Sequence, residues 1–344
     1  DVFDFSVESD RHMGLANGIL VHNCSEFLWL DESACNLSSV NLLKFLNEDG
    51  SFNIEGYKHT VDVMITAMEI MVSRCEYPTP EITQNSHDFR TLGLGYANLG
   101  ALLMAKGMAY DSDEGRDYAA SITALMTGEA YKRSAELAAI KGPFNAFPLN
   151  REPMLDIINK HINNIPKDIS HVSLPDANIW IAAHSIWGEA GYLGWQYGYR
   201  NAQVSLLAPT GTISIMMDCD TTGCEPDSSL VRYKKLAGGG TIKHVNGVVT
   251  RALKNLFGID GPNSCVEKAK EWYEKFGTFA GYLSEDILPV FDCAFPDNRG
   301  RSINWEGHVK MVAAVQPFLS GGISKTINMP QESTVEDIEK AYRM

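Results

Sequence analysis

The chain has 344 residues, of which 44% are hydrophobic and 21% are charged, as in a globular protein with a sizeable core. Its formal net charge of −14 provides no basic excess for a nucleic-acid polymer, so we expect any nucleotide partner to be a small molecule. No apolar run reaches the roughly 18 residues of a membrane span, which predicts no membrane partner. Because Asp1 is not Met and no basic leader follows it, we expect a fragment without a signal peptide.

The cysteine pattern argues against a secreted disulfide framework and against a structural zinc site, so no metal is expected. The count is odd, and no Cys-x-x-Cys motif occurs. A reducing, cytoplasmic location is therefore expected, in which any disulfide chemistry is catalytic. The seven cysteines are Cys24, Cys35, Cys75, Cys219, Cys224, Cys265 and Cys293.

Residues 1–23 have the pattern of a β-hairpin. Residues 2–7 alternate apolar and polar side chains, as a half-buried strand does. Asn17-Gly18 is a strong hairpin-turn signal, and the β-prone residues 19–21 follow it. Two strands of this length are marginal alone, so they are expected to need partner strands from elsewhere.

From residue 24 onward, strand and helix patterns alternate, which predicts an α/β fold, either a barrel or an open sheet. Pro78 and Pro80 are expected to end the first helix, and the glycines between 86 and 107 to allow close packing of the second. Helices are predicted at 54–76, 86–107, 112–141, 150–163, 184–198, 247–257, 264–276 and 304–318, with a last one starting near Ser333. Strands are predicted at 27–30, 35–42, 201–208 and 324–329, and a flexible turn at 238–240.

A thiol and a carboxylate stand two positions apart in Cys24-Ser25-Glu26. Residues at this spacing lie on the same face of a strand, so both groups could address one ligand. The strand-turn-strand pattern that follows could return Cys35 to the neighbourhood of Cys24. The alternative is a pair of buried structural cysteines with a surface glutamate.

The second candidate site is a turn that follows the predicted strand at 201–208. It offers hydroxyl groups and backbone N–H groups, its glycine allows close approach of an anion, and a following helix would add a favourable dipole. An ordinary turn is the alternative, and the absence of Gly-Lys-Ser/Thr argues against a Walker-type nucleotide site. The turn comprises Ala208, Pro209, Thr210, Gly211, Thr212, Ile213 and Ser214.

The acidic run at 218–227 has four carboxylates that could hold a hard cation, but their spacing is not that of an EF-hand. Its cysteines, Cys219 and Cys224, are expected to be structural thiols rather than a disulfide. Lys325 is expected to have a structural role at the rim of the fold, and His308 to be a core or surface histidine rather than a ligand.

Residues 1–24 resemble the C-terminal blocks of inteins. They contain Val-Phe-Asp-x-x-Val, a histidine, Leu-Ala-Asn-Gly and then Val-His-Asn-Cys. The resemblance implies that Asn23 cyclises and cleaves its own peptide bond with help from His22, and that Cys24 is the acceptor nucleophile. It implies that Asp4 and His12 tune the earlier acyl shifts. The first nucleophile would belong to an upstream intein half, so this chain alone is not expected to splice, and an ordinary hairpin is the alternative.

Residues 24–37, beginning Cys-Ser-Glu-Phe-Leu-Trp-Leu, resemble the finger loop of ribonucleotide reductases, and are closest to the adenosylcobalamin-dependent class II enzymes. Arg-Thr-Leu-Gly-Leu-Gly at 90–95 and the stretches 201–235 and 300–330 extend the resemblance over essentially all of 24–344. It implies a ten-stranded α/β barrel, of which 24–344 would form the truncated C-terminal half plus part of the finger loop. Residues 1–23 would be a separate intein segment.

The resemblance also implies roles for single residues. Cys24 would become a thiyl radical that takes the ribose 3′ hydrogen, Glu26 would be the base for the 3′ hydroxyl, and Cys35 would be one of two reducing cysteines. The turn at 208–214 would hold the substrate phosphates. The family motif is Asn-x-Cys-x-Glu, and His22 occupies the first position here until ligation to an upstream half would restore the asparagine.

The implied reaction is reduction of ribonucleoside diphosphates to 2′-deoxyribonucleotides, with adenosylcobalamin as cofactor and a thioredoxin-like dithiol as reductant. The upstream intein and reductase half would be a partner, and a homodimer is a further option. The alternatives are a class I-type reductase with a separate radical-generating subunit, a glycyl-radical enzyme, or a fragment whose only autonomous activity is intein-type cleavage at Asn23.

Overall fold

The computed structural model describes residues 13–14, 20–21, 26–173, 175–235, 241–258 and 265–344. The described part of the N-terminal segment is a short antiparallel pair, in which β1 (Met13–Gly14) lies beside β2 (Leu20–Val21). These strands flank the predicted Asn17-Gly18 turn. The predicted strand at 2–7, the turn at 238–240, and the predicted splicing and radical residues Asp4, His12, His22, Asn23 and Cys24 lie outside the described residues.

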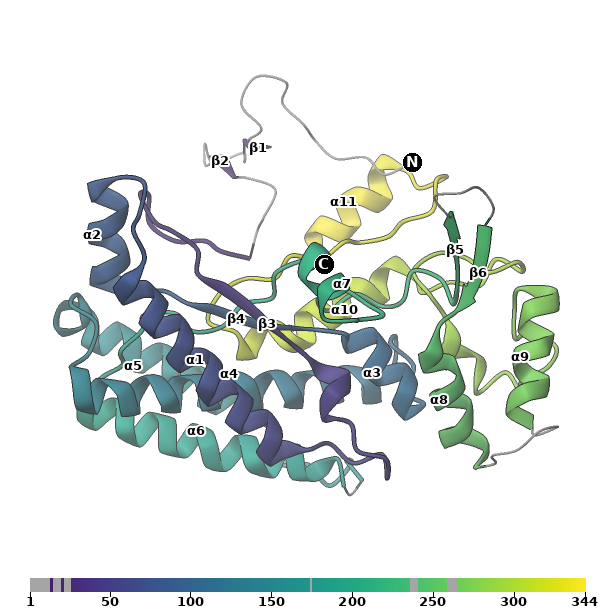
Figure 1. Ribbon diagram of the computed structural model, residues 1–344, viewed down its shortest axis with the longest axis horizontal. Coiled ribbons are helices and arrows are strands. Elements are labelled where there is room, and N and C mark those ends of the chain that lie inside the picture. Colours follow the sequence, from purple (N-terminus) through teal and green to yellow (C-terminus); the bar gives the residue numbers. More distant parts are fainter. Residues whose placement is uncertain (1–12, 15–19, 22–25, 174, 236–240, 259–264) are drawn as a thin grey trace.

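Helices dominate the remainder of the chain (Figure 1). They are α1 (Ile54–Arg74), α2 (Pro80–Phe89), α3 (Leu99–Lys106), α4 (Asp113–Lys141), α5 (Phe147–Asn164), α6 (Ala177–Tyr197), α7 (Gly211–Met216), α8 (Gly247–Phe257), α9 (Cys265–Phe276), α10 (Trp305–Val315) and α11 (Val335–Arg343). The strands are β3 (Leu37–Asn41), β4 (Gly93–Ala97), β5 (Val231–Lys235) and β6 (Thr241–Val245).

Four extended segments lie side by side and run in the same direction. β3 and β4 form a parallel pair. Residues 203–207 continue this array beside β4 through the parallel bridge between Leu94 and Ser205, and residues 320–324 follow through the bridge between Leu207 and Ile323. This small parallel array, together with the helices, agrees with the predicted α/β class.

The central helix of the layer below the array is α4, which packs against α6, α1 and α10 (Figure 1). Gly128 of α4 leaves room for the ring of Trp187, because a Cβ at this position would lie 2.8 Å from the indole. The indole N–H of Trp187 donates to the Ala124 carbonyl oxygen at 2.8 Å, so a large buried ring keeps its polar group satisfied. This packing gives the array a rigid base.

The helix predicted at 86–107 is wrong. Instead, α2 ends at Phe89, β4 follows, and α3 begins at Leu99. All five residues of β4 are buried, so the strand shows no alternation of apolar and polar side chains that would reveal it in the sequence. Gly95 is required there by close approach, since a Cβ would lie 2.5 Å from the Leu206 carbonyl oxygen.

Two predicted strands are also absent from the structure. Residues 27–30 are not a strand, and Leu28 and Leu30 are 65% and 53% exposed, because the segment packs only one side, with the Trp29 ring on Phe89. Residues 324–329 are not a strand either, since pairing with 203–207 ends at Ser324. The hairpin of β5 and β6 was not predicted. The other helices are confirmed, and α6 begins earlier than expected.

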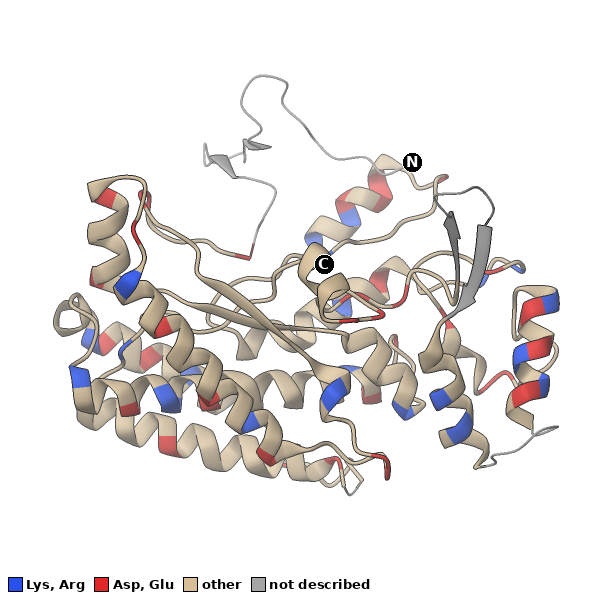
Figure 2. Cartoon of the chain, viewed as in Figure 1, with Lys and Arg blue, Asp and Glu red and all other residues tan. Residues whose placement is uncertain are grey.

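Charged residues are spread over the helices with both signs intermixed in the view of Figure 2, for example along α1 and α9. No helix in the described ranges is both long enough and apolar enough to cross a membrane.

Candidate functional site at the carboxyl ends of the parallel segments

The carboxyl ends of the four parallel segments meet at one edge of the array, where polar residues follow each segment. Asn41 ends β3, Asn98 follows β4, Thr210 follows the segment 203–207, and Lys325 follows 320–324. Ligands commonly bind at the carboxyl edge of parallel strands. This edge is therefore the first place to look for a functional site.

Two asparagines fix the loop after α7 to the ends of β3 and β4. The Asn98 amide donates to the Asn41 side-chain oxygen at 3.0 Å, and its own oxygen accepts from the backbone N–H groups of Asp220 and Thr221, both at 2.9 Å. Asn98 has a φ of 73°, a left-handed conformation that asparagine tolerates better than most residues. Asn41 donates to the Met217 carbonyl oxygen at 3.2 Å.

The predicted turn at 208–214 is present at this edge, and α7 begins within it, at Gly211. Thr210 is buried with a φ of 51°, and its hydroxyl oxygen accepts from the Gly223 N–H at 2.6 Å. Gly211, Thr212 and Ile213 are exposed. The first N–H groups of a helix lack partners within the helix, so this turn has donors available to a ligand.

Other residues of the turn are oriented differently. Ala208 is buried and Pro209 is exposed. Ser214 is buried, and its hydroxyl donates to the Gly211 carbonyl oxygen at 2.8 Å. Its hydroxyl group therefore stabilises the turn from within.

Glu26 lies beside the 320–324 segment, which separates it from the segment that leads into this turn. Its carbonyl oxygen accepts from the Gly322 N–H at 2.8 Å, and the Gly322 carbonyl oxygen accepts from the Leu207 N–H at 3.0 Å. The Glu26 side chain is only 3% exposed, and its Oε2 has no hydrogen-bond partner in the described part of the chain. A buried carboxylate oxygen of this kind is costly unless a ligand or another group satisfies it.

Cys35 lies at the opposite edge of the array. It is exposed and precedes β3, whereas Thr210 follows the carboxyl end of its segment. Six extended residues from Cys35 to Asn41 span roughly 20 Å. The structure thus places Glu26 near the 208–214 turn but leaves Cys35 away from it.

The sequence did not reveal a buried ion pair at the same edge. Lys325 Nζ lies 2.5 Å from Glu225 Oε2, 2.7 Å from His308 Nδ1 and 2.6 Å from the Thr326 carbonyl oxygen. Burial, together with the charge of Lys325, lowers the pKa of His308 to about 3, so the imidazole is neutral. Lysine has only donors, and the imidazole therefore accepts at Nδ1.

The acidic run at 218–227 does not converge on one point. Glu225 binds Lys325, whereas Asp227 accepts a short hydrogen bond from the Asn246 amide. In the ranges that the structure describes, no three His, Cys, Asp or Glu side chains are grouped as metal ligands. Cys219 and Cys224 are free thiols, and burial raises their pKa values to about 11 and about 12.

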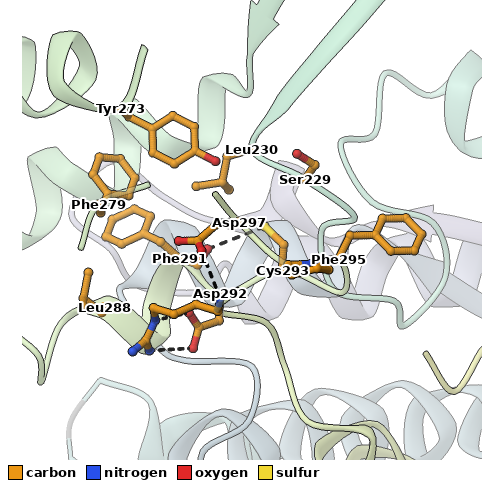
Figure 3. Close-up of a pocket in the computed structure, with 12 residues that line it drawn as sticks. Ser229, Leu230, Tyr273, Phe279, Leu288, Phe291, Asp292, Cys293, Phe295 and Asp297 are labelled. Carbon is orange, nitrogen blue, oxygen red and sulfur yellow. Dashed lines mark hydrogen bonds and ion pairs between the residues drawn. The ribbon is translucent and has the colours of Figure 1, made fainter. Parts of the chain in front are cut away.

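Two cavities lie away from this edge. The smaller, of about 30 Å³, has the volume of a single water site and is bordered by the Arg301–Asp292 ion pair and Cys293 (Figure 3). The larger, of about 640 Å³, lies over α4, α6 and α10, and includes Trp180 and Lys310. Neither is lined by Glu26 or by the turn residues.

Comparison with known proteins identifies the family. A family model described as "Ribonucleotide reductase, barrel domain" matches residues 16–344. A vitamin B12-dependent ribonucleotide reductase of Rhodopirellula baltica is 48% identical over 324 residues, which cover 93% of this chain and 30% of that protein. The enzyme of the same name from Streptomyces avermitilis is 46% identical over 327 residues, which cover 93% of this chain and 33% of that protein.

A third relative of that name, from Bradyrhizobium diazoefficiens, is 37% identical over 445 residues, which cover 98% of this chain and 35% of that protein. The chain thus spans about a third of the length of these relatives. A family match over residues 16–344 covers nearly the whole chain. The chain therefore belongs to the ribonucleotide reductase barrel-domain family.

Proposed function

We propose that residues 24–344 form the C-terminal half of the catalytic barrel of a B12-dependent ribonucleotide reductase. The assembled enzyme would reduce ribonucleoside diphosphates to 2′-deoxyribonucleotides. The observation that carries the proposal is the position of Glu26, a buried carboxylate linked through Gly322 to Leu207, directly before the 208–214 turn. A proton acceptor and an anion-binding turn would then lie on opposite sides of the 320–324 segment.

In this proposal the turn binds the substrate phosphates. The exposed start of α7 offers the backbone N–H groups of Gly211, Thr212 and Ile213, which favour a negatively charged group. Thr210 is turned inward, with its hydroxyl oxygen bound by Gly223, so it shapes the turn and does not contact the phosphates through that oxygen.

The chemistry is assigned to three side chains. Cys24, as a thiyl radical, takes the 3′ hydrogen of the ribose, while the Glu26 carboxylate accepts the proton of the 3′ hydroxyl. Cys35, with a second cysteine of the complete protein, supplies two electrons and two protons and ends as a disulfide. A buried carboxylate whose Oε2 has no partner among the described residues is suited to this role, because binding of the substrate hydroxyl would satisfy that oxygen.

Adenosylcobalamin, when bound, supplies the radical that oxidises the cysteine thiol. The names of the three relatives support this cofactor. No described side chain has contacts that would assign it to the corrin, so the steps above use only the chain's own residues. A thioredoxin-like dithiol would reduce the cysteine pair after each turnover.

The proposal is tested with the full-length ligated reductase that contains this chain. Formation of 2′-deoxyribonucleotide is measured with and without adenosylcobalamin, and again with a metal-bearing radical subunit. We expect a strict requirement for adenosylcobalamin, and a loss of at least a thousandfold in kcat for Glu26→Gln. The control is Glu32→Gln, which changes an exposed carboxylate in the same segment. Activity that depends instead on the metal-bearing subunit, or near-normal turnover of Glu26→Gln, would show that the assignment is wrong.

A second activity is proposed for residues 1–23, as the C-terminal segment of an intein that is removed by splicing. Two observations support it. The relatives from Rhodopirellula and Streptomyces align with 93% of the chain, a share equal to that of residues 24–344. The second is the antiparallel pairing of β1 with β2 on either side of Asn17-Gly18, which a hairpin in this segment would contain.

Splicing is tested by mixing the chain with the matching N-terminal precursor and following the products by mass spectrometry. We expect a ligated product joined at Cys24, which Asn23→Ala abolishes. Asn47→Ala, at an exposed asparagine of the reductase segment, serves as the control and is expected to ligate normally. Absence of any ligated product from the unaltered chain, or ligation that is insensitive to Asn23→Ala, would rule out the intein assignment.

A further inference from the structure

We propose that Lys325 is a positioning residue that holds the 208–214 turn in its binding conformation through Glu225 and Gly223. This inference rests on the proposed phosphate-binding role of the turn. It also assigns a role to the acidic run at 218–227, whose carboxylates do not form a metal site in the described ranges. Lys325 is hydrogen-bonded to Glu225, Cys224 joins Glu225 to Gly223 along the chain, and Gly223 is hydrogen-bonded to Thr210.

The ammonium of Lys325 cannot itself bind a substrate phosphate in this arrangement. Its side chain is 2% exposed, and its three N–H donors match three acceptors, Glu225 Oε2, His308 Nδ1 and the Thr326 carbonyl oxygen. A lysine whose donors are all occupied inside the protein acts on a ligand only indirectly. The arrangement therefore indicates a structural role. We call Lys325 and Glu225, together with the neutral His308 of α10, the Glu225 clamp.

Glu225 connects this clamp to the loop that supports the turn. Its second carboxylate oxygen accepts from the Thr326 N–H at 2.8 Å, so both oxygens are bound to the 325–326 segment. Its own N–H donates to the Thr222 carbonyl oxygen at 2.9 Å, which closes a tight turn around Gly223. On the other side, Tyr110 donates to the Cys224 carbonyl oxygen at 2.8 Å.

Gly223 then contacts the phosphate turn directly. Its N–H donates to the Thr210 hydroxyl oxygen at 2.6 Å, and a Cβ on Gly223 would lie 2.9 Å from the Ala208 carbonyl oxygen. Thr210 has a φ of 51°, which is uncommon for a β-branched residue and has to be held by its surroundings. The Glu225 clamp fixes the position of Gly223, and Gly223 in turn holds Thr210.

Loss of the Lys325–Glu225 pair is expected to change the turn at 208–214 more than the rest of the site. Without the Lys325 ammonium, Glu225 keeps its bond to the Thr326 N–H but loses its ion pair, so the 222–225 loop is held less firmly and Thr210 can relax from the left-handed region. The amides of residues 208–216 are then expected to exchange faster, and the turn to bind phosphate groups less well. The chemical steps at Glu26 would be affected much less, because its backbone attachment runs through Gly322.

The experiment uses the full-length ligated reductase with Lys325→Met and, as a milder second variant, Glu225→Gln. Lys310→Met is the matched control, because Lys310 is a half-exposed lysine on α10 that pairs with the exposed Glu306. Hydrogen exchange of the peptide spanning 208–216 is followed by mass spectrometry. Kinetic constants for a ribonucleoside diphosphate, and competition by inorganic pyrophosphate, are measured on the same samples.

We expect both variants to exchange at least fivefold faster in residues 208–216, with KM and the pyrophosphate inhibition constant raised at least tenfold and kcat changed less than threefold. Lys310→Met should match the unaltered enzyme. Unchanged exchange in both variants would overturn the inference, as would faster exchange with an unchanged KM or a loss confined to kcat. If pyrophosphate does not compete in the unaltered enzyme while exchange responds as expected, the clamp stands and the phosphate-binding role of the turn fails.

Discussion

Replacement of Glu69 is expected to be one of the most destabilising changes in the chain. Glu69 lies on α1 and is 7% exposed. Its carboxylate accepts from Arg90 Nε at 2.7 Å, from Arg200 Nε at 2.8 Å and from the Asn201 amide at 2.8 Å. One acidic side chain therefore holds together α1, the end of α2 and the start of the 201–207 segment.

The magnitude follows from what Glu69→Ala leaves behind. Two guanidinium groups, of which Arg90 is 5% exposed, would lose the carboxylate that they share. Breaking a buried ion pair by removing one partner costs about 3 to 5 kcal/mol, because an uncompensated charge stays buried. Glu69→Gln retains one acceptor oxygen and the side-chain shape, and is expected to cost roughly half as much.

The assay is urea unfolding of the chain followed by circular dichroism. With a slope of about 3 kcal/mol per M, Glu69→Ala should lower the urea midpoint by about 1 M or more. The control is Glu55→Ala on the same helix, whose 82% exposed carboxylate pairs with Lys58 and should contribute less than about 1 kcal/mol. If Glu69→Ala and Glu55→Ala shift the midpoint equally, the buried network does not stabilise the fold as argued.

Three further changes have defined outcomes. Burial, followed by the neighbouring charge of Asp62, raises the pKa of Glu129 to about 7. Above about pH 4.5 the folded chain therefore keeps a proton on Glu129 that the unfolded chain has released. The free energy of unfolding consequently falls as the pH rises from about 4.5 to 7. Glu129→Gln should remove this loss and stabilise the chain by about 1 to 3 kcal/mol at pH 8 and much less at pH 5. Urea unfolding at both pH values measures the difference. Equal effects at the two pH values would contradict the raised pKa. Gly95→Ala should destabilise by at least about 2 kcal/mol, because its methyl group would meet the Leu206 carbonyl oxygen at 2.5 Å. Gly188 lies in α6, and a Cβ added there would meet no neighbouring side chain or segment within 4 Å. Gly188→Ala should therefore stabilise the helix by about 0.5 to 1 kcal/mol and raise the thermal midpoint. A lower midpoint would refute this.

The helices were largely predictable because their signals are local. The buried face of α1, with Tyr57, Val61, Ile65 and Met68, has the helical spacing that the sequence shows. α4 begins after the Ser112 cap and ends at Gly142, at the residues that the capping pattern indicates. Both kinds of signal depend on residues within one or two turns of each other.

Strands buried on both faces could not be recognised in the same way. β4 has no polar side, and its glycines are present because Leu206 of a distant segment lies against them. Periodicity within residues 86–107 cannot show this, and a helix was predicted. The apolar run at 27–30 was predicted to be a buried strand, but Leu28 and Leu30 are exposed and the segment is not a strand. Whether a short apolar run is buried depends on distant segments, which local periodicity does not show.

The candidate site was predicted in part. The 208–214 turn and the following helix are found where the pattern indicated an anion-binding turn, while Glu26 was singled out by its distance of two positions from Cys24. The roles of both, and those of Cys24 and Cys35, remain proposals. No pattern in the sequence indicated that Lys325 and Glu225 form a pair, although each lies in a stretch with a predicted role of its own.

By itself the sequence determined the α/β class, the turn at 208–214 and the helices other than α2 and α3, because these features depend on hydrogen bonds and burial patterns among neighbouring residues. The tertiary structure alone decided that β4 is a strand, that Glu69 binds two arginines, and that Lys325 pairs with Glu225. The last of these joins residues that are 100 positions apart. Such pairs form only when the packed core has fixed the strand ends beside one another, so no local pattern in the sequence encodes them.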